Sequence, residues 1–102
     1  METLYFTIDA SRFTTRREAH RAMKEVFAGY EYYGNNLDAL HDVLTSIRQD
    51  AEITVCGLAQ AREQIDAYAD RLLLVFSDAA EENPHLHFIY PEEEPQEEEE
   101  NG

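Results

Sequence analysis

The chain is poor in cysteine and has no long apolar run. Cys56 is its only cysteine, which excludes an internal disulfide and favours a reducing compartment. No apolar stretch approaches the roughly 20 residues that cross a bilayer. The first residues also lack the basic and apolar regions of a signal peptide. We therefore expect a soluble, cytoplasmic protein without a membrane partner.

Basic residues are scarce as well. The chain has 8 basic and 22 acidic side chains, a formal net charge of −14. Seven of the acidic residues are glutamates of the C-terminal stretch 92–100, and five of the basic ones fall in the first quarter. An acidic surface repels phosphate backbones and attracts basic proteins. A nucleic acid is therefore not expected as a partner, whereas a basic protein is.

Sequence motifs of catalysis are also missing. The chain contains no nucleophile elbow, no glycine-rich phosphate loop and no paired cysteines, so neither an enzyme nor a cofactor is expected. His85 and His87 on one strand face, or His41 beside Asp42, make a zinc site imaginable. No compact set of ligands accompanies them, and no metal is expected. Cys56 is interpreted as a small core residue.

The apolar pattern predicts an α/β fold. Strands are expected over 4–8 (buried on both faces), 53–56 and 86–90. The first helix is expected to start at a capping box of Thr15 and Glu18 and to end at Gly29. Further helices are expected over 37–48, 58–66 and 68–82. This order, β-α-α-β-α-α-β, favours a three-stranded parallel sheet packed with four helices.

Two parts of the chain differ in composition. Residues 1–90 are expected to form one domain, because the apolar pattern runs through them without a break. Residues 91–102 are rich in glutamate and cannot build a core. We expect them to form a disordered, extended acidic tail.

The stretch 32–45 joins an aromatic-glycine turn to an amphipathic helix. Asn35 or Asn36 can cap that helix by accepting a backbone N–H of the first turn. One side of the helix is an apolar stripe made of Leu37, Leu40, Val43, Leu44 and Ile47. The stretch is therefore expected to present carboxylates and tyrosines on a rigid edge.

Two pairs of carboxylates stand at i,i+4 on expected helices. Asp42 follows Asp38, and Glu82 follows Asp78. Like charges at this spacing cost about 0.2–0.5 kcal/mol. The helix dipole also disfavours an anion near the helix C-terminus, where Glu82 is expected to lie. The pairs are either ordinary solvated carboxylates or a surface that a cationic partner neutralises.

The motif Tyr32-Tyr33-Gly34-x-Asn36-Leu37-Asp38-Ala39-Leu40-x-Asp42 resembles the signature of the barstar family, small intracellular inhibitors of guanyl-specific ribonucleases. A weaker likeness extends over about the first ninety residues. The resemblance implies the same sheet with four helices, and an inhibitor that we expect to be monomeric when free. The alternative is an acidic regulatory module whose basic partner is not a ribonuclease.

The resemblance also implies roles for individual residues. Asp42 would be the principal phosphate mimic and Asp38 the second anion, with Asp78 at the rim of the enzyme's cleft and Glu82 outside it. Tyr32 would stack on the catalytic base. The expected partner-binding residues are Tyr32, Tyr33, Gly34, Asn36, Leu37, Asp38, His41, Asp42, Asp78 and Glu82.

Three positions depart from the family pattern. His41 occupies a position that is often aromatic, Asn35 replaces an acidic residue, and Ile47 stands where an aromatic residue is found. These changes are expected to remove contact area without touching the central carboxylates. They bear on the identity of the partner more than on the chemistry of inhibition.

Overall fold

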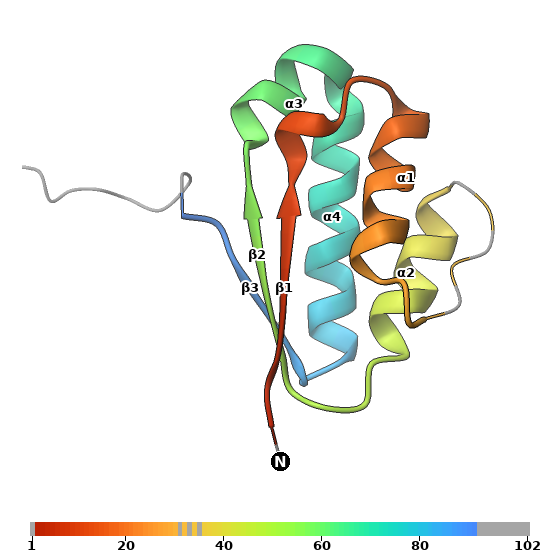
Figure 1. The fold of residues 1–102 in the computed structure, drawn as a ribbon, viewed down its shortest axis with the longest axis vertical. Coiled ribbons are helices and arrows are strands. Elements are labelled where there is room, and N and C mark those ends of the chain that lie inside the picture. The colour runs from red at the N-terminus through yellow and green to blue at the C-terminus, as the bar shows by residue number, and fades with distance from the viewer. Residues whose placement is uncertain (1, 31, 33, 35, 92–102) are drawn as a thin grey trace, which may run out of the picture.

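Three parallel strands and the helices between them make up the computed structural model, which describes residues 2–30, 32, 34 and 36–91 (Figure 1). The elements in chain order are β1 (Leu4–Asp9), the short 3-10 helix η1 (Ala10–Arg12), α1 (Arg16–Val26), α2 (Leu37–Thr45), β2 (Ala51–Cys56), α3 (Leu58–Ile65), α4 (Ala67–Glu82) and β3 (Leu86–Ile89). The strand order is β1-β2-β3. The predicted fold class is confirmed. The stretch expected to be a disordered tail lies, from residue 92, outside the described residues.

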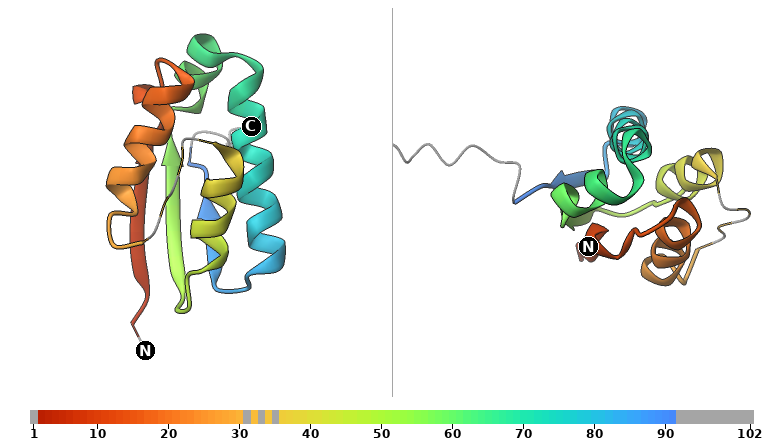
Figure 2. Two further views of the ribbon diagram at one scale, coloured as in Figure 1. Left: turned by 90° about the vertical axis from the view of Figure 1, so that its right-hand side faces the viewer. Right: turned by 90° about the horizontal axis from the view of Figure 1, so that it is seen from above.

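The helices α1, α2 and α4 lie on one side of the sheet (Figures 1 and 2). Along β1, buried or half-buried positions accordingly alternate with exposed ones, and along β2 buried positions alternate with half-buried ones. In β1, Ile8 is fully buried, whereas Tyr5 is 74% exposed. The expectation that this strand is buried on both faces is wrong, because helices cover only one of its faces.

The helix starts follow their capping residues. The hydroxyl of Thr15 accepts the backbone N–H of Glu18 at 3.0 Å, and the amide oxygen of Asn36 accepts that of Ala39 at 2.8 Å. The predicted Thr15 cap is confirmed. The second helix, for which Asn35 or Asn36 was predicted, is capped by Asn36. The predicted end of α1 is not confirmed: the helix stops at Val26, and Gly29 does not adopt a left-handed conformation.

A buried amide connects α4 to α2. Asn83 follows the last residue of α4 and is 6% exposed. Its side chain donates to the carbonyl oxygens of Leu44 at 3.0 Å and Ile47 at 2.9 Å. Leu44 lies in the last turn of α2, where backbone oxygens lack a partner within the helix, and Ile47 follows just after the helix end. The end of α2 is therefore held against the end of α4.

The core fills the space between the sheet and the helices. Its largest fully buried apolar side chains are Phe13, Phe27, Phe76, Ile8, Met23, Leu40, Leu44, Ile47 and Ile53. Cys56 is only half-buried, on the face of β2 opposite to Ile53 and Val55, so its interpretation as a core residue is wrong. No helix in the described part of the chain combines the length and the apolar character that a bilayer crossing requires.

The geometry of the turn from β2 into α3 predicts that alanine substitution at Gly57 destabilises the fold more than alanine substitution at Gly29. Gly57 has φ +75°, and a Cβ built on it would lie 2.6 Å from the backbone nitrogen of Ser11. Gly57→Ala should therefore lower the free energy of unfolding by about 2 kcal/mol or more. Gly29→Ala is the matched control, because a methyl group added at Gly29 would meet no neighbouring group within 4 Å, and it should change stability by less than about 0.5 kcal/mol. Urea denaturation measures both, and equal effects would contradict the packing at Gly57.

Candidate protein-binding surface

Helix α2 lies between α1 and α4 in the left view of Figure 2. Its buried side chains include Leu40, Val43 and Leu44, which face the core. Because residues three and four apart share one side of a helix, Asp38 and Asp42 lie together on the opposite side. Both are exposed.

A contact between α2 and α4 brings two carboxylate rows together. The Nε2 of His41 lies 3.2 Å from a carboxylate oxygen of Glu82. His41 is adjacent in sequence to Asp42, and Glu82 is one turn beyond Asp78 on α4. The polar sides of the two helices therefore meet at this contact. We call the four carboxylates Asp38, Asp42, Asp78 and Glu82 the acidic edge.

Three carboxylates of the acidic edge point to solvent. Asp38, Asp42 and Asp78 are exposed, and within the described ranges none of them forms an ion pair. Glu82 is 61% exposed despite its contact with His41. The acidic edge thus offers carboxylate oxygens to a partner without first breaking a strong internal bond.

The segment that leads into α2 holds the other expected binding residues. Gly34 is exposed with φ +80°, a conformation that favours glycine. Asn36 is exposed and caps α2, and Leu37 is half-buried. Tyr33 lies outside the described residues. The described part of this segment therefore borders the acidic edge at the N-terminus of α2.

Tyr32 lies in the core instead of on an exposed edge. It is 9% exposed, and its hydroxyl lies 2.6 Å from Nδ1 of His20. The expectation that this tyrosine is presented outward is wrong for the free chain. Its predicted contact with a partner stays a prediction, and only a small part of the residue is accessible for that contact.

His20 is the residue that sequence reasoning missed. It is fully buried on α1, and its Nε2 lies 2.7 Å from the hydroxyl of Tyr68 at the start of α4. One imidazole therefore links the segment before α2 to α4. The only sequence signal was a histidine on the apolar side of α1, between Ala19 and Ala22.

The surroundings of this link keep its three groups neutral. Burial, and to a smaller extent the charge of Lys24, lowers the pKa of His20. Burial raises the pKa of Tyr32 well above its ordinary value, with a smaller contribution from Tyr68. Burial also raises the pKa of Tyr68, while Arg16 and Arg71 act in the opposite direction. A neutral imidazole donates from one nitrogen and accepts at the other, which suits two hydroxyl partners.

The departures from the family pattern do not all affect the surface. Ile47 is 1% exposed, so this side chain offers no contact area to a partner, and the expected loss of contact relative to an aromatic residue stays a prediction. His41 is half-buried and contacts Glu82, so its effect on the surface is direct. Asn35 lies outside the described residues.

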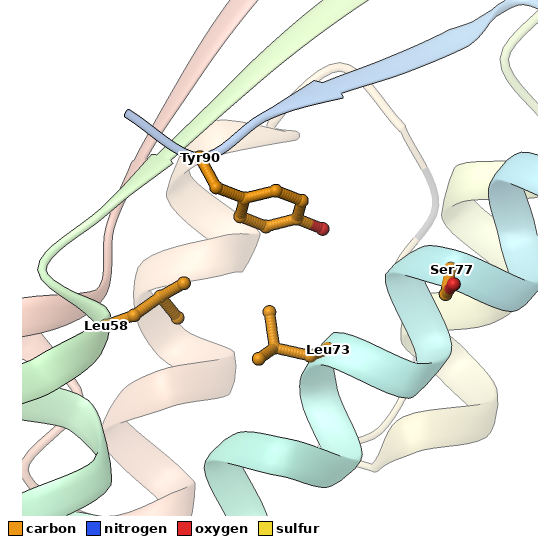
Figure 3. Close-up of a pocket in the computed structure, with 4 residues that line it drawn as sticks. All are labelled: Leu58, Leu73, Ser77 and Tyr90. Atoms are coloured by element: carbon orange, nitrogen blue, oxygen red, sulfur yellow. The ribbon is translucent and has the colours of Figure 1, made fainter. Parts of the chain in front are cut away.

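A cleft beside α4 offers little chemistry. A cleft of about 240 Å³ is lined by Leu58, Leu73, Ser77 and Tyr90 (Figure 3). Burial raises the pKa of Tyr90 to about 12, so its hydroxyl stays protonated. Leu73 and Ser77 lie on a different side of α4 from Asp78 and Glu82. The cleft is therefore separate from the acidic edge.

The histidines considered for zinc have other contacts. His85 Nδ1 lies 3.0 Å from a carboxylate oxygen of Asp50, and this hydrogen bond is the largest cause that lowers the pKa of Asp50. His87 is exposed on β3. Among the residues that the structure places, no three histidine, cysteine or acidic side chains gather as metal ligands would.

The buried His20 predicts a pH dependence of stability. The pKa of His20 is lowered in the folded chain from the ordinary 6.5. At pH values between the folded-state pKa and 6.5, the unfolded chain therefore binds more protons than the folded chain. The free energy of unfolding should be highest above pH 6.5 and should fall as the pH drops through the folded-state pKa. His20→Gln cannot take up this proton, so urea denaturation between pH 7.5 and 5 should show a weaker fall for the variant. Parallel pH curves for both proteins would contradict this assignment.

Comparison with known proteins agrees with this architecture. No curated protein matches the chain. A family-wide sequence profile described as Barstar (barnase inhibitor) matches residues 3–96. The match covers the sheet, the helices between its strands and every residue of the acidic edge. The chain belongs to the barstar family.

Proposed function

We propose that this chain is an intracellular inhibitor of a barnase-like, guanyl-specific ribonuclease. It would block the active site by placing carboxylates where the RNA phosphate binds. The family is described by inhibition of barnase, and the acidic edge supplies a chemical means for it. The observation that carries the proposal is the contact of His41 with Glu82 at 3.2 Å, because it joins the carboxylates of two helices into one surface.

The chemistry follows from how a ribonuclease holds its substrate. A cleft that binds a phosphate presents cationic donors such as arginine, lysine and protonated histidine. A carboxylate accepts hydrogen bonds from the same donors, and charge-assisted bonds of this kind are short and strong. A folded protein that supplies such carboxylates fills the cleft without offering a bond to cleave. Substrate mimicry therefore needs only fixed anions and a rigid support.

Within this proposal each carboxylate has its own place. Asp42 would lie at the centre of the phosphate site, with Asp38 beside it near the N-terminus of α2. Asp78 would reach a basic group at the rim of the cleft, and Glu82 would lie outside it. The contact with His41 connects Glu82 to α2, which is consistent with an outer position beside the centre.

The segment before α2 would complete the contact. Gly34 carries no side chain, so a partner can approach its backbone closely, and Asn36 and Leu37 follow at the start of α2. Tyr33 and the accessible edge of Tyr32 are proposed to contact the enzyme's catalytic base region. His41 lies between Asp38 and Asp42 along α2 and would face the partner in place of an aromatic ring.

The overall charge would speed the encounter. A formal net charge of −14 attracts a basic enzyme over several ångströms, and salt weakens that attraction. The same field disfavours binding of RNA itself. An acidic regulatory module with a different basic partner would share these properties, so inhibition of a ribonuclease separates the two functions.

Titration against a barnase-type ribonuclease tests the proposal. RNA cleavage should stop at about one equivalent of this chain at low salt. Raising the salt from about 50 to 200 mM should slow association, because steering between exposed charges is screened. Stopped-flow fluorescence measures the association rate. Absence of inhibition at micromolar protein would overturn the proposal, and association that is independent of salt would overturn the steering.

Removal of the Asp42 carboxylate should weaken inhibition more than removal of an equal charge elsewhere on the surface. Asp42→Ala should weaken inhibition by at least about a hundredfold, because it leaves a desolvated cation of the enzyme without a partner, a range of effects that includes the barnase–barstar pair itself. Asp70→Ala is the matched control: Asp70 is 67% exposed at the start of α4 and pairs with Arg62. It removes the same charge and should change inhibition less than about threefold. Equal losses would contradict the central place of Asp42, and circular dichroism checks that both variants are folded.

A further inference from the structure

Helix α1 carries a row of basic side chains on one side. Arg17, Arg21 and Lys24 follow at i, i+4 and i+7, which places them on a single stripe of the helix. Arg17 and Arg21 are exposed, and Lys24 is half-buried. Together with Glu18 they line a shallow hollow of about 340 Å³. We call these three residues the basic strip.

The stability of α1 accounts for only one charge of the basic strip, that of Lys24 in the last turn, which the helix dipole favours. Like charges three or four residues apart cost a few tenths of a kcal/mol each. Glu18 pairs with Arg21 at 3.4 Å and offsets one of the three charges, so the hollow keeps an excess of positive charge. The other two arginines of this region have separate contacts: Arg12 pairs with Glu25, and Arg16 lies over the ring of Tyr68.

The basic strip adjoins the proposed inhibitory surface. The ammonium of Lys24 lies 5.9 Å from the centre of the Tyr32 ring, at the segment that leads into α2. Figure 2 shows α1 on one side of α2 and α4 on the other. The basic strip on α1 and the acidic edge on α2 and α4 therefore belong to neighbouring helices, with Lys24 at the side of α1 that contacts Tyr32.

A uniformly basic partner would not fit this arrangement. The cations of the basic strip weaken the attraction that the carboxylates exert on a basic partner. A positive surface of the partner that lay over the basic strip would be repelled. Complementary potentials across an interface require the opposite sign on the partner at each place. The surface therefore fits a partner with a basic cleft and a neighbouring acidic patch.

We propose that the basic strip is a second part of the inhibitory interface, and that the ribonuclease carries acidic residues beside its phosphate-binding cleft. Lys24 and Arg17 would contact those acidic residues when Asp42 occupies the cleft. This inference rests on the proposed function and adds the charge pattern that its partner must have. The strip would then select among ribonucleases that share the same cationic cleft.

Charge reversal distinguishes docking from simple steering by the sign of the effect. Lys24→Glu and Arg17→Glu each make the chain more acidic by two charges. If the partner were uniformly basic, both variants would associate faster and bind as tightly as the wild type or more tightly. If the strip docks on an acidic patch, each variant should dissociate faster and lose about tenfold in affinity. Surface plasmon resonance with the barnase-type ribonuclease inhibited in the titration above gives both rates.

Arg48→Glu is the matched control. Arg48 is exposed in the segment between α2 and β2, at the end of α2 away from Tyr32, and its reversal changes the net charge equally. It should leave the dissociation rate unchanged. Arg17 is exposed, so Arg17→Glu tests whether the basic strip contacts the partner even if Lys24→Glu disturbs the packing against Tyr32.

The outcomes separate this inference from the function on which it rests. Wild-type inhibition combined with faster dissociation of both strip variants supports the inference. Wild-type inhibition with unchanged or tighter binding of Arg17→Glu overturns it and leaves the proposed function intact. Failure of the wild type to inhibit overturns the proposed function, and the inference falls with it.

Discussion

The packing of α2 against α4 is the constraint on which the surface depends. Each helix carries one pair of the carboxylates of the acidic edge. The four carboxylates form one surface only because the two helices are packed in a fixed orientation. Two contacts hold that relation: the amide of Asn83 binds the carbonyls of Leu44 and Ile47 in the interior, and His41 meets Glu82 at the surface. Loss of this amide would remove the hydrogen bond to the carbonyl of Ile47 and one of the hydrogen bonds to the carbonyl of Leu44. The rigid support for the acidic edge is therefore built into the core.

The placement of charge shows where stability and function diverge. Pairs of like charges recur on α1, α2 and α4, and each pair costs the isolated helix a small amount of free energy. On α2 and α4 the pairs are acidic, and on α1 they are basic. A chain selected only for stability would alternate the signs along each helix. A chain that binds a charged partner gains from separating them, because each patch then meets its complement as a unit.

Much of the fold could be predicted from the sequence because local signals agreed with one another. Thr15 caps α1 as predicted, and Asn36, one of the two candidates, caps α2. The spacing of Leu40, Val43 and Leu44 identified the buried side of α2. The face of β1 that helices leave uncovered could not be predicted, since the side chain of Tyr5 suits either a buried or an exposed position. The link from Tyr32 through His20 to Tyr68 was also out of reach. It joins three residues far apart in the chain, and no local pattern records a pairing of that kind.

The central claim is that the acidic edge occupies the place of a substrate phosphate. Competition between this chain and guanosine 3′-monophosphate, a phosphate-bearing ligand of a guanyl-specific active site, tests it most directly. We predict that the apparent Kd of the chain for a barnase-type ribonuclease rises in proportion to the nucleotide concentration, with no complex that contains both ligands. An apparent Kd that does not change with saturating nucleotide would contradict phosphate mimicry.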